Sequence, residues 1–298
     1  MFMTIEMKSE LMKAIAAAKV VSFDVFDTLL FRKVNEPETI FDLVGRHYGI
    51  HGFRKLRVDA QNEASRRAYS KAKHPHADMN EIYEVLKETP DTAVNWDEVK
   101  QFEIDLERDA LAGNPEMLEV LTEAKKLGKR VIATTDMYLL ASTIGEYLEA
   151  NGFGDIDHIY CSADEYKAKF NKELFVLVAD REKCDYKDIL HIGDNKSADV
   201  EIPKSLGMST FLYVHDADME KFEKAGCTEI DNGIYKILYD KHKGFWYNLG
   251  VEAGGPIYLG LTLWIEDIIR NSDRKVYFLS RDGYNLYNIL KNKGYSNI

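Results

Sequence analysis

Strand and helix signals alternate along the chain from residue 113 onward, and this alternation restricts the fold more than any other feature of the sequence. Short apolar runs, typical of buried strands, are separated by segments whose apolar residues have helical spacing. Including one earlier run, we predict strands at 20–24, 130–135, 158–161, 189–192 and 210–214. This order is typical of βα units, so we expect an α/β protein with a doubly wound, Rossmann-like parallel sheet as its core.

Local helix signals agree with this interpretation. Asn114-Pro115 predicts the start of a helix, because Asn is a favoured N-cap and Pro suits the first helical position. Gly128 predicts the end of that helix. A second helix should close at Asn151-Gly152, and a third should begin near Lys172.

Between the first strand and Gly113 the pattern changes to helices only. Helical spacing occurs over residues 36–48, 54–73, 78–88 and 96–111. We therefore expect an all-helical cap at residues 33–112, inserted into an α/β core made of residues 1–32 and 113–225.

The helical region carries opposite charges on two of its stretches. Residues 54–73 hold seven Lys or Arg residues against two acids, whereas residues 81–109 hold ten acids against three bases. Such faces favour pairing with each other or solvation. The alternative is that the basic stretch attracts an anionic substrate, in which case charge reversal at Arg66 and Arg67 would change the Michaelis constant.

The C-terminal part, residues 226–298, has a different pattern. An apolar helix is expected near Pro256–Ile269. A strand at Val276–Ser280, followed by a helix, is typical of the opening of a further α/β unit. This extension either packs on the first domain or belongs to a longer natural protein, and we favour the second interpretation.

Composition excludes several classes of protein. The apolar runs are too short to span a bilayer and the N-terminus lacks the apolar region of a signal peptide, so we expect a cytoplasmic protein with no membrane span. A net charge of -11 opposes binding to nucleic acid. The widely spaced Cys161, Cys184 and Cys227 argue against a disulfide framework and against a structural zinc site.

Polar residues that could take part in catalysis or ligand binding fall into four segments. Most of these segments lie at predicted strand ends, where doubly wound sheets bind ligands. The segments contain Asp24 with Thr28; Thr135; Lys169 in KFNKELF; and Asp194, Asn195 and Asp199 in HIGDNKSAD. In order and spacing the set resembles the four motifs of the haloacid dehalogenase (HAD) superfamily of Asp-nucleophile hydrolases, over roughly residues 15–215.

The resemblance implies a phosphatase that acts on a small phosphorylated substrate. Asp24 would attack phosphorus and form an aspartyl phosphate, Thr135 would donate a hydrogen bond to a phosphate oxygen, and Lys169 would keep Asp24 ionised.

The resemblance also implies Mg²⁺ as cofactor, because this ion favours oxygen ligands and relieves repulsion between carboxylates. Asp24, Asp194 and the backbone carbonyl of Phe26 would be its protein ligands. Asp199 would orient Lys169 or a metal-bound water. Thr28 and Asn195 would support the site.

Phe26 departs from the pattern of the family's phosphatases, which usually carry a second Asp at this position as general acid and base. Asp27 follows, where the family commonly has Gly. In an extended backbone successive side chains point to opposite faces, so we expect Asp27 to brace the cap linker against Arg32 or Lys33. A role for Asp27 as the acid is the alternative. Loss of a positioned acid lowers turnover about 10²- to 10⁴-fold.

Two other functions stay open. Phe26 is similar to the aromatic residue of the family's metal-independent dehalogenases, although those typically lose the acidic fourth motif. The missing acid also favours a catalytically weak binding or regulatory domain. Segments of the FDxFDTLL type resemble superfamily members that accompany glycosyltransferases in bacterial surface-polysaccharide systems, which would make a glycosyltransferase a partner.

The histidines receive less specific interpretations. His191 lies in a buried strand pattern, so we expect it in the core rather than in catalysis. His74-Pro75-His76 is expected to form a polar loop of the cap rather than a metal site.

Overall fold

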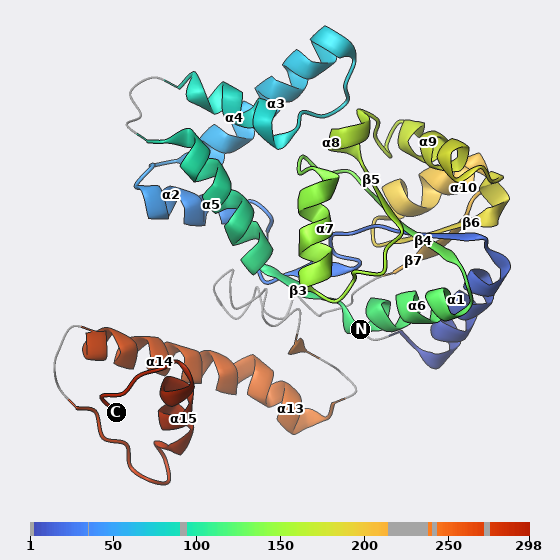
Figure 1. Ribbon diagram of the computed structural model, residues 1–298. Helices are drawn as coiled ribbons and strands as arrows, with labels where there is room; N and C mark the ends of the chain where they lie inside the picture. Colours follow the sequence, from blue (N-terminus) through green and yellow to red (C-terminus); the bar gives the residue numbers. More distant parts are fainter. Residues whose placement is uncertain (1–2, 35, 90–93, 214–237, 240–242, 271–274) are drawn as a thin grey trace. The chain divides into compact units, whose positions relative to one another are not determined.

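The computed structural model describes residues 3–34, 36–89, 94–213, 238–239, 243–270 and 275–298 (Figure 1). The chain divides into two compact units, Met1–Ile237 and Leu238–Ile298. Among the helices in the described ranges, none combines the length and the apolar character that crossing a membrane requires.

A five-stranded parallel sheet forms the centre of the first unit. Its strand order is β5-β4-β1-β6-β7, with every neighbouring pair parallel. The strands are β1 (Val20–Phe23), β4 (Arg130–Thr135), β5 (His158–Cys161), β6 (Ile189–Gly193) and β7 (Ser209–Leu212). The predicted fold class is confirmed. The last strand ends two residues before Val214, which lies outside the described residues.

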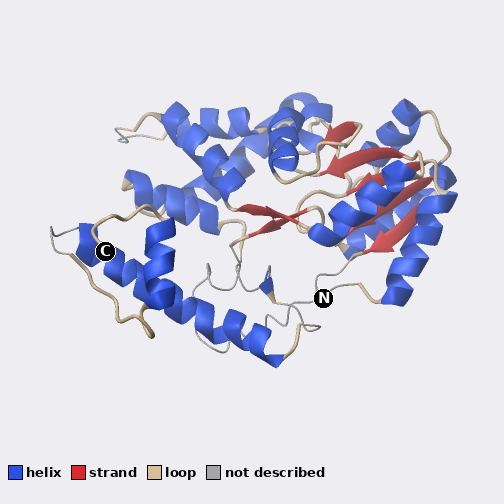
Figure 2. Cartoon of the chain, turned by 60° about the horizontal axis from the view of Figure 1, so that its bottom comes forward, coloured by secondary structure: helices blue, strands red, loops and turns tan. Residues whose placement is uncertain are grey.

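Helices cover both faces of this sheet (Figures 1 and 2). They are α1 (Ile5–Ala17), α6 (Pro115–Lys126), α7 (Ala141–Ala150), α8 (Ser162–Glu165), α9 (Glu173–Glu182) and α10 (Ile202–Leu206). As predicted, Asn114 caps α6, its side chain accepting hydrogen bonds from two backbone N–H groups of the first turn. Because both faces are covered, β1 and β6 are buried along their whole length.

The two faces of β1 pack against different clusters. Val21 and Phe23 belong to the larger apolar core, which continues into the inserted helices. Val20 faces the other way and packs with Phe175 and Val178 of α9. Since side chains alternate along a strand, Ser22 also points to the α9 side of the sheet.

The inserted region lies between two short strands, β2 (Leu30–Arg32) and β3 (Leu111–Gly113), which pair antiparallel. The helices described within it are α2 (Thr39–Tyr48), α3 (Phe53–Ala72), α4 (Met79–Lys87) and α5 (Trp96–Asp109). All four helices were predicted, but the prediction of helices only is wrong at both ends. A strand of three residues is too short to show the alternation on which recognition depends.

The basic stretch of α3 is largely neutralised within the insertion. Arg66 and Arg67 both contact Glu63, and Arg67 also pairs with Glu88 at 2.6 Å. The pairing that we preferred to a substrate-binding role is therefore present.

A buried polar cluster joins the inserted helices to the core. The guanidinium of Arg57 pairs with Glu103 at 2.9 Å, and both side chains are fully buried. Tyr83 donates a hydrogen bond to Glu103 (2.7 Å). Tyr138, from the segment after β4, donates to Glu107 (3.0 Å), and its ring lies 4.9 Å from the Arg57 guanidinium carbon.

The second unit contains α13 (Phe245–Leu249), α14 (Gly255–Arg270) and α15 (Tyr284–Asn292). The predicted apolar helix is α14. The predicted strand at Val276–Ser280 is wrong: the segment makes a backbone hydrogen bond from Val276 to Asn297 but finds no pairing strand among the described residues. A pattern of strand residues becomes a strand only where a partner completes the ladder.

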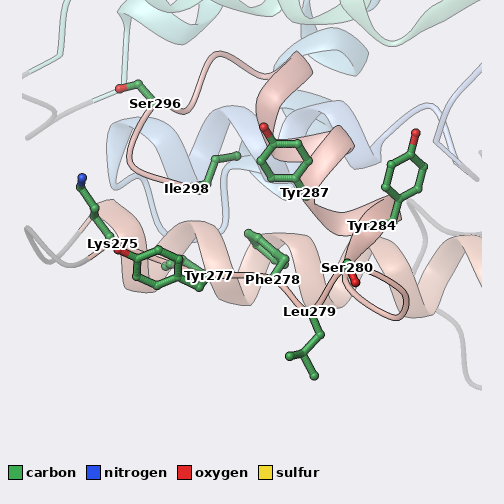
Figure 3. A pocket seen from close by; sticks show the side chains of 10 residues that line it. Lys275, Tyr277, Phe278, Leu279, Ser280, Tyr284, Tyr287, Ser296 and Ile298 are labelled. Carbon is green, nitrogen blue, oxygen red and sulfur yellow. The ribbon is translucent and has the colours of Figure 1, made fainter.

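The same segment lines a pocket of about 450 Å³ within this unit (Figure 3). The rings of Phe278 and Tyr287 lie on it with their centroids 6.2 Å apart. The other lining residues are Lys275, Val276, Tyr277, Leu279, Ser280, Tyr284, Ser296 and Ile298.

Candidate active site

A buried lysine and two carboxylates form the centre of the candidate site. Asp24 follows β1 directly, and its backbone N–H donates to Ile192 of β6 (2.8 Å), which continues the strand ladder. The Lys169 ammonium donates to Asp24 Oδ1 (2.5 Å) and to Asp199 Oδ1 (2.7 Å). All three residues are less than a tenth exposed. The structure therefore brings together three of the residues named from the sequence.

The lysine is positioned by its own backbone. Lys169 lies between α8 and α9, and its N–H donates to both carboxylate oxygens of Asp136, at 2.9 and 3.0 Å. Asp136 follows β4 in the polar pair Thr135-Asp136, which was expected at a strand end, but sequence reasoning assigned Asp136 no role in the site. The signal was its position directly after a predicted strand.

Asp199 receives hydrogen bonds on both of its oxygens. Oδ1 accepts from Lys169 and contacts His191 Nε2 at 3.1 Å, while Oδ2 accepts from the backbone N–H of Asn195 at 3.0 Å. The side chain of Asn195 caps the following helical turn, which carries Asp199. These contacts leave Asp199 better suited to holding Lys169 than to binding a metal.

Gly193 allows the close approach of Asp199. A Cβ atom at Gly193 would lie 2.4 Å from Asp199 Cγ and 2.5 Å from its Oδ2. Neither atom could move away from such a Cβ, because the contacts just described hold the Asp199 carboxylate in place. A glycine is therefore required where β6 ends.

Asp194 completes a cluster of three carboxylates. Asp24, Asp194 and Asp199 each offer one oxygen, and these atoms lie within 4.8 Å of one another. Thr28 donates a longer hydrogen bond to Asp194 Oδ1 (3.4 Å). Asp199 is engaged by Lys169 and Asn195, which leaves Asp24 and Asp194 as the hard oxygen donors. Mg²⁺ is usually bound through one or two carboxylates, so the residues present fit this ion.

The pKa values of the cluster show its surplus of negative charge. Burial raises the pKa of Asp24 to about 7, with Lys169 opposing and Asp199 reinforcing the shift. Burial also raises the pKa of Asp194 to about 6, with Asp27 and Asp199 adding to it. Burial would raise the pKa of Asp199 too, but the hydrogen bonds from His191 and Lys169 and the charge of Lys169 lower it instead. The site is thus short of positive charge at Asp24 and Asp194.

The turn after Asp24 differs from the expected extended backbone. Asp27 has a φ of 59°, in the left-handed region, so strand alternation does not decide where its side chain points, and that part of our reasoning is wrong. Arg32 Nη1 donates to Asp27 Oδ2 (2.6 Å), which confirms one of the two predicted contacts. The Arg32 guanidinium also lies over the ring of Phe26, 4.5 Å from its centroid.

Thr135 and Phe26 lie at the same edge of the sheet as Asp24. Thr135 ends β4, which pairs with β1, and it is buried. The backbone of Phe26 forms an isolated β-bridge with Leu30 in the turn. The phosphate contact of Thr135 and the metal contact of the Phe26 carbonyl stay predictions.

The loop between α3 and α4 lies against residues that flank the site. The His74 ring stacks on Tyr166 with the centroids 3.8 Å apart. His76 Nε2 lies 3.9 Å from Asp136 Oδ2. Met79, at the start of α4, donates its N–H to the carbonyl of Tyr138 (2.8 Å). The inserted region therefore contacts the core next to Lys169.

Comparison with known proteins gives a match to one family model. The family model described as haloacid dehalogenase-like hydrolase matches residues 18–207. A search of curated proteins found no significant match. The solved structures that match the chain include two of low sequence identity, each with a TM-score below 0.5.

One of these structures is a dehalogenase and the other is a phosphatase. The L-2-haloacid dehalogenase from Xanthobacter autotrophicus is 17% identical, with a TM-score of 0.49, and the match covers 74% of this chain and 88% of that one. A HAD phosphatase from Thermococcus onnurineus is 19% identical, with a TM-score of 0.46, and the match covers 67% and 88%.

Proposed function

Since the chain belongs to the haloacid dehalogenase-like hydrolase family, we propose that it is a Mg²⁺-dependent phosphatase that uses Asp24 as its nucleophile. One observation carries the proposal: Asp24, Asp194 and Asp199 converge within 4.8 Å, and Lys169 is the ammonium that contacts two of them. A cluster with this surplus of negative charge needs a cation, and a phosphate ester brings further negative charge that a cation would also offset.

The residues divide the chemistry between them. Lys169 holds Asp24 Oδ1, so the second oxygen of Asp24 is the one available to attack phosphorus. Attack forms an Asp24–phosphorus bond and breaks the bond to the ester oxygen, and water then hydrolyses the aspartyl phosphate. Thr135 would donate to a phosphate oxygen. Mg²⁺, held by Asp24, Asp194 and the Phe26 carbonyl, would supply charge stabilisation.

Phe26 shapes the range of substrates in this proposal. Position 26 carries no carboxyl group to protonate the leaving oxygen, and the nearest candidate, Asp27, is engaged by Arg32. Because a positioned acid contributes about 10²- to 10⁴-fold, we expect phosphates with good leaving groups to be hydrolysed far better than alkyl phosphates.

The inserted helices act as the cap of the site in this proposal. Their contacts with the core next to Lys169, through His76 and Met79, support a role in excluding water and in selecting the substrate. Residues 33–112 would then form the cap, residues 1–32 and 113–225 the core, and residues 226–298 a separate extension.

Hydrolysis of p-nitrophenyl phosphate tests the proposal, because this leaving group needs little protonation. Wild-type protein should be active with Mg²⁺ and inactive with EDTA, and Asp24→Asn should be inactive in both. The exposed Asp155→Asn serves as the matched control for the same chemical change and should keep wild-type activity.

A binding or regulatory domain is the second candidate, and Phe26 is the observation that favours it. A folded protein that binds Mg²⁺ without hydrolysing the aryl phosphate would support this candidate and reject the phosphatase. Halide release from a 2-haloacid in the presence of EDTA would instead support a metal-independent dehalogenase.

A further inference from the structure

A line of buried polar side chains crosses three strands of the sheet and ends on the candidate site. Thr134 of β4 and Ser22 of β1 are joined through their hydroxyl oxygens, which lie 2.9 Å apart. Ser22 Oγ lies 2.8 Å from His191 Nδ1, and His191 Nε2 lies 3.1 Å from Asp199 Oδ1. Each of the four residues is at most 1% exposed.

The strand register produces this line. Ser22 lies opposite His191 in the pairing of β1 with β6. Val20, Ile132 and Ile189, each two residues before one of the polar residues, pack on the α9 side of the sheet, so the polar side chains lie on that side as well. The Phe175 ring of α9 meets the His191 ring edge-on, with the centroids 4.9 Å apart.

The hydrogen-bond inventory selects one form of the imidazole. The carboxylate of Asp199 can only accept, so His191 Nε2 carries a proton and donates it. Nδ1 is then the acceptor for the Ser22 hydroxyl, whose oxygen accepts from Thr134. Burial lowers the pKa of His191, more than Asp199 raises it, which agrees with a neutral ring.

Packing alone does not account for these residues. Leu190 and Ile192, the neighbours of His191 in β6, are fully buried apolar side chains. Polar groups in the same position cost free energy of desolvation that their hydrogen bonds only partly return. What the polar line adds is a second donor on Asp199 Oδ1, the atom that holds Lys169.

We propose that His191 is a positioning residue: its Nε2–H fixes the Asp199 carboxylate, which in turn holds the Lys169 ammonium on the nucleophile Asp24. This inference rests on the proposed function for its kinetic consequence. The role in holding Lys169 does not depend on which reaction the site performs.

Two amide variants of the full chain separate the two nitrogens of the ring. The amide of His191→Asn can replace Nδ1 but does not reach Asp199, whereas the amide of His191→Gln reaches the position of Nε2. Loss of a hydrogen-bonding partner behind a site residue typically costs about 10- to 100-fold. We therefore expect kcat on p-nitrophenyl phosphate to fall by about that factor in His191→Asn, with KM within about threefold, and to recover to within about fivefold of wild type in His191→Gln.

His158→Asn is the matched control, because His158 is an exposed residue of β5, and it should leave kcat unchanged. In an Asp199→Asn background, His191→Asn should cost nothing further. Equal activity in the Asn and Gln variants, or additive losses with Asp199→Asn, would overturn the proposal.

Nuclear magnetic resonance gives a readout that does not need activity. In the wild type, ¹⁵N shifts should show His191 as the neutral Nε2–H form, and the buried Lys169 ammonium should give a slowly exchanging signal. That signal should be lost in His191→Asn and retained in His191→Gln. If the wild type hydrolyses no phosphate, the proposed function fails while this measurement still decides the positioning role; an unchanged ammonium signal in His191→Asn would reject it.

Discussion

Two buried charged clusters in this chain have similar burial and different charge balance. In the inserted helices, Arg57 and Glu103 pair one to one, and Tyr83 donates to the same carboxylate. At the sheet edge, Lys169 faces the carboxylates of Asp24 and Asp199, with Asp194 beside them.

The charge balance distinguishes a cluster that stabilises the fold from a candidate functional site. A matched ion pair with its hydrogen bonds filled needs nothing from outside the protein. At the sheet edge, burial and the neighbouring carboxylates together raise the pKa of Asp24 and Asp194, and this cluster has more carboxylates than cations, so it gains from a cation or a ligand. Burial of charge is common to both clusters, so the imbalance is what marks the site.

Replacing the cation of each cluster by Met should have its largest effect at Lys169. Lys169→Met should reduce phosphatase activity at least about 10³-fold, because it removes the group that holds Asp24 and offsets transition-state charge. It should also lower the melting temperature in EDTA, and Mg²⁺ should restore part of the loss, since an ion at 100 times its Kd contributes about 2.7 kcal/mol. Activity assays and thermal melts with and without Mg²⁺ check both parts.

The same replacement at Arg57 should affect stability instead. Arg57→Met leaves Glu103 buried without its partner, which typically costs about 3–5 kcal/mol. Urea unfolding should show this loss with no rescue by Mg²⁺, while kcat of the folded fraction stays within about threefold. A double variant, Arg57→Met with Glu103→Leu, should recover stability, and failure to recover any would show that the pair is not an isolated unit.

Glu107, a further buried acid of the inserted helices, should make the free energy of unfolding depend on pH. Burial raises the pKa of Glu107 above its ordinary value of 4.5, so the folded protein holds this proton more tightly than the unfolded chain does. The free energy of unfolding should therefore fall as pH rises from about 4.5 through the raised pKa. Glu107→Gln should flatten that decline in urea titrations at several pH values, whereas the exposed Glu119→Gln should leave it as in the wild type.

The smallest effect is expected at the exposed pairs of α3. Arg66 and Arg67 contact Glu63 and Glu88 on the surface, and such pairs contribute about 0–1 kcal/mol. Charge reversal of both arginines should leave KM for the aryl phosphate unchanged. A rise in KM would return the basic stretch to a role in attracting the substrate.

Features carried by contiguous sequence could be predicted. The five strands and the helices between them follow from apolar runs and caps such as Asn114. The convergence of Asp24, Lys169, Asp194 and Asp199 was expected from the order and spacing of their segments. The strand at Val276–Ser280 was predicted from its residues, but strand formation depends on a partner that sequence pattern does not specify.

Features that depend on register or on single dihedral angles could not be predicted. The contact of Ser22 with His191 exists because two strands pair in one register, and the left-handed conformation of Asp27 removes the alternation that we assumed. His191 was correctly expected in the core, yet its contact with Asp199 was not foreseen. A cytoplasmic location and a glycosyltransferase partner stay predictions.

The antiparallel pairing of β2 with β3 has a consequence for how such a chain can diversify. Leu30 lies opposite Gly113 and Arg32 opposite Leu111, so the inserted helices begin and end on adjacent strands. In topological terms they replace the turn of a β-hairpin, whose ends are about 5 Å apart whatever lies between them. A different module with the same closely spaced ends can be exchanged there without changing the register of the parallel sheet.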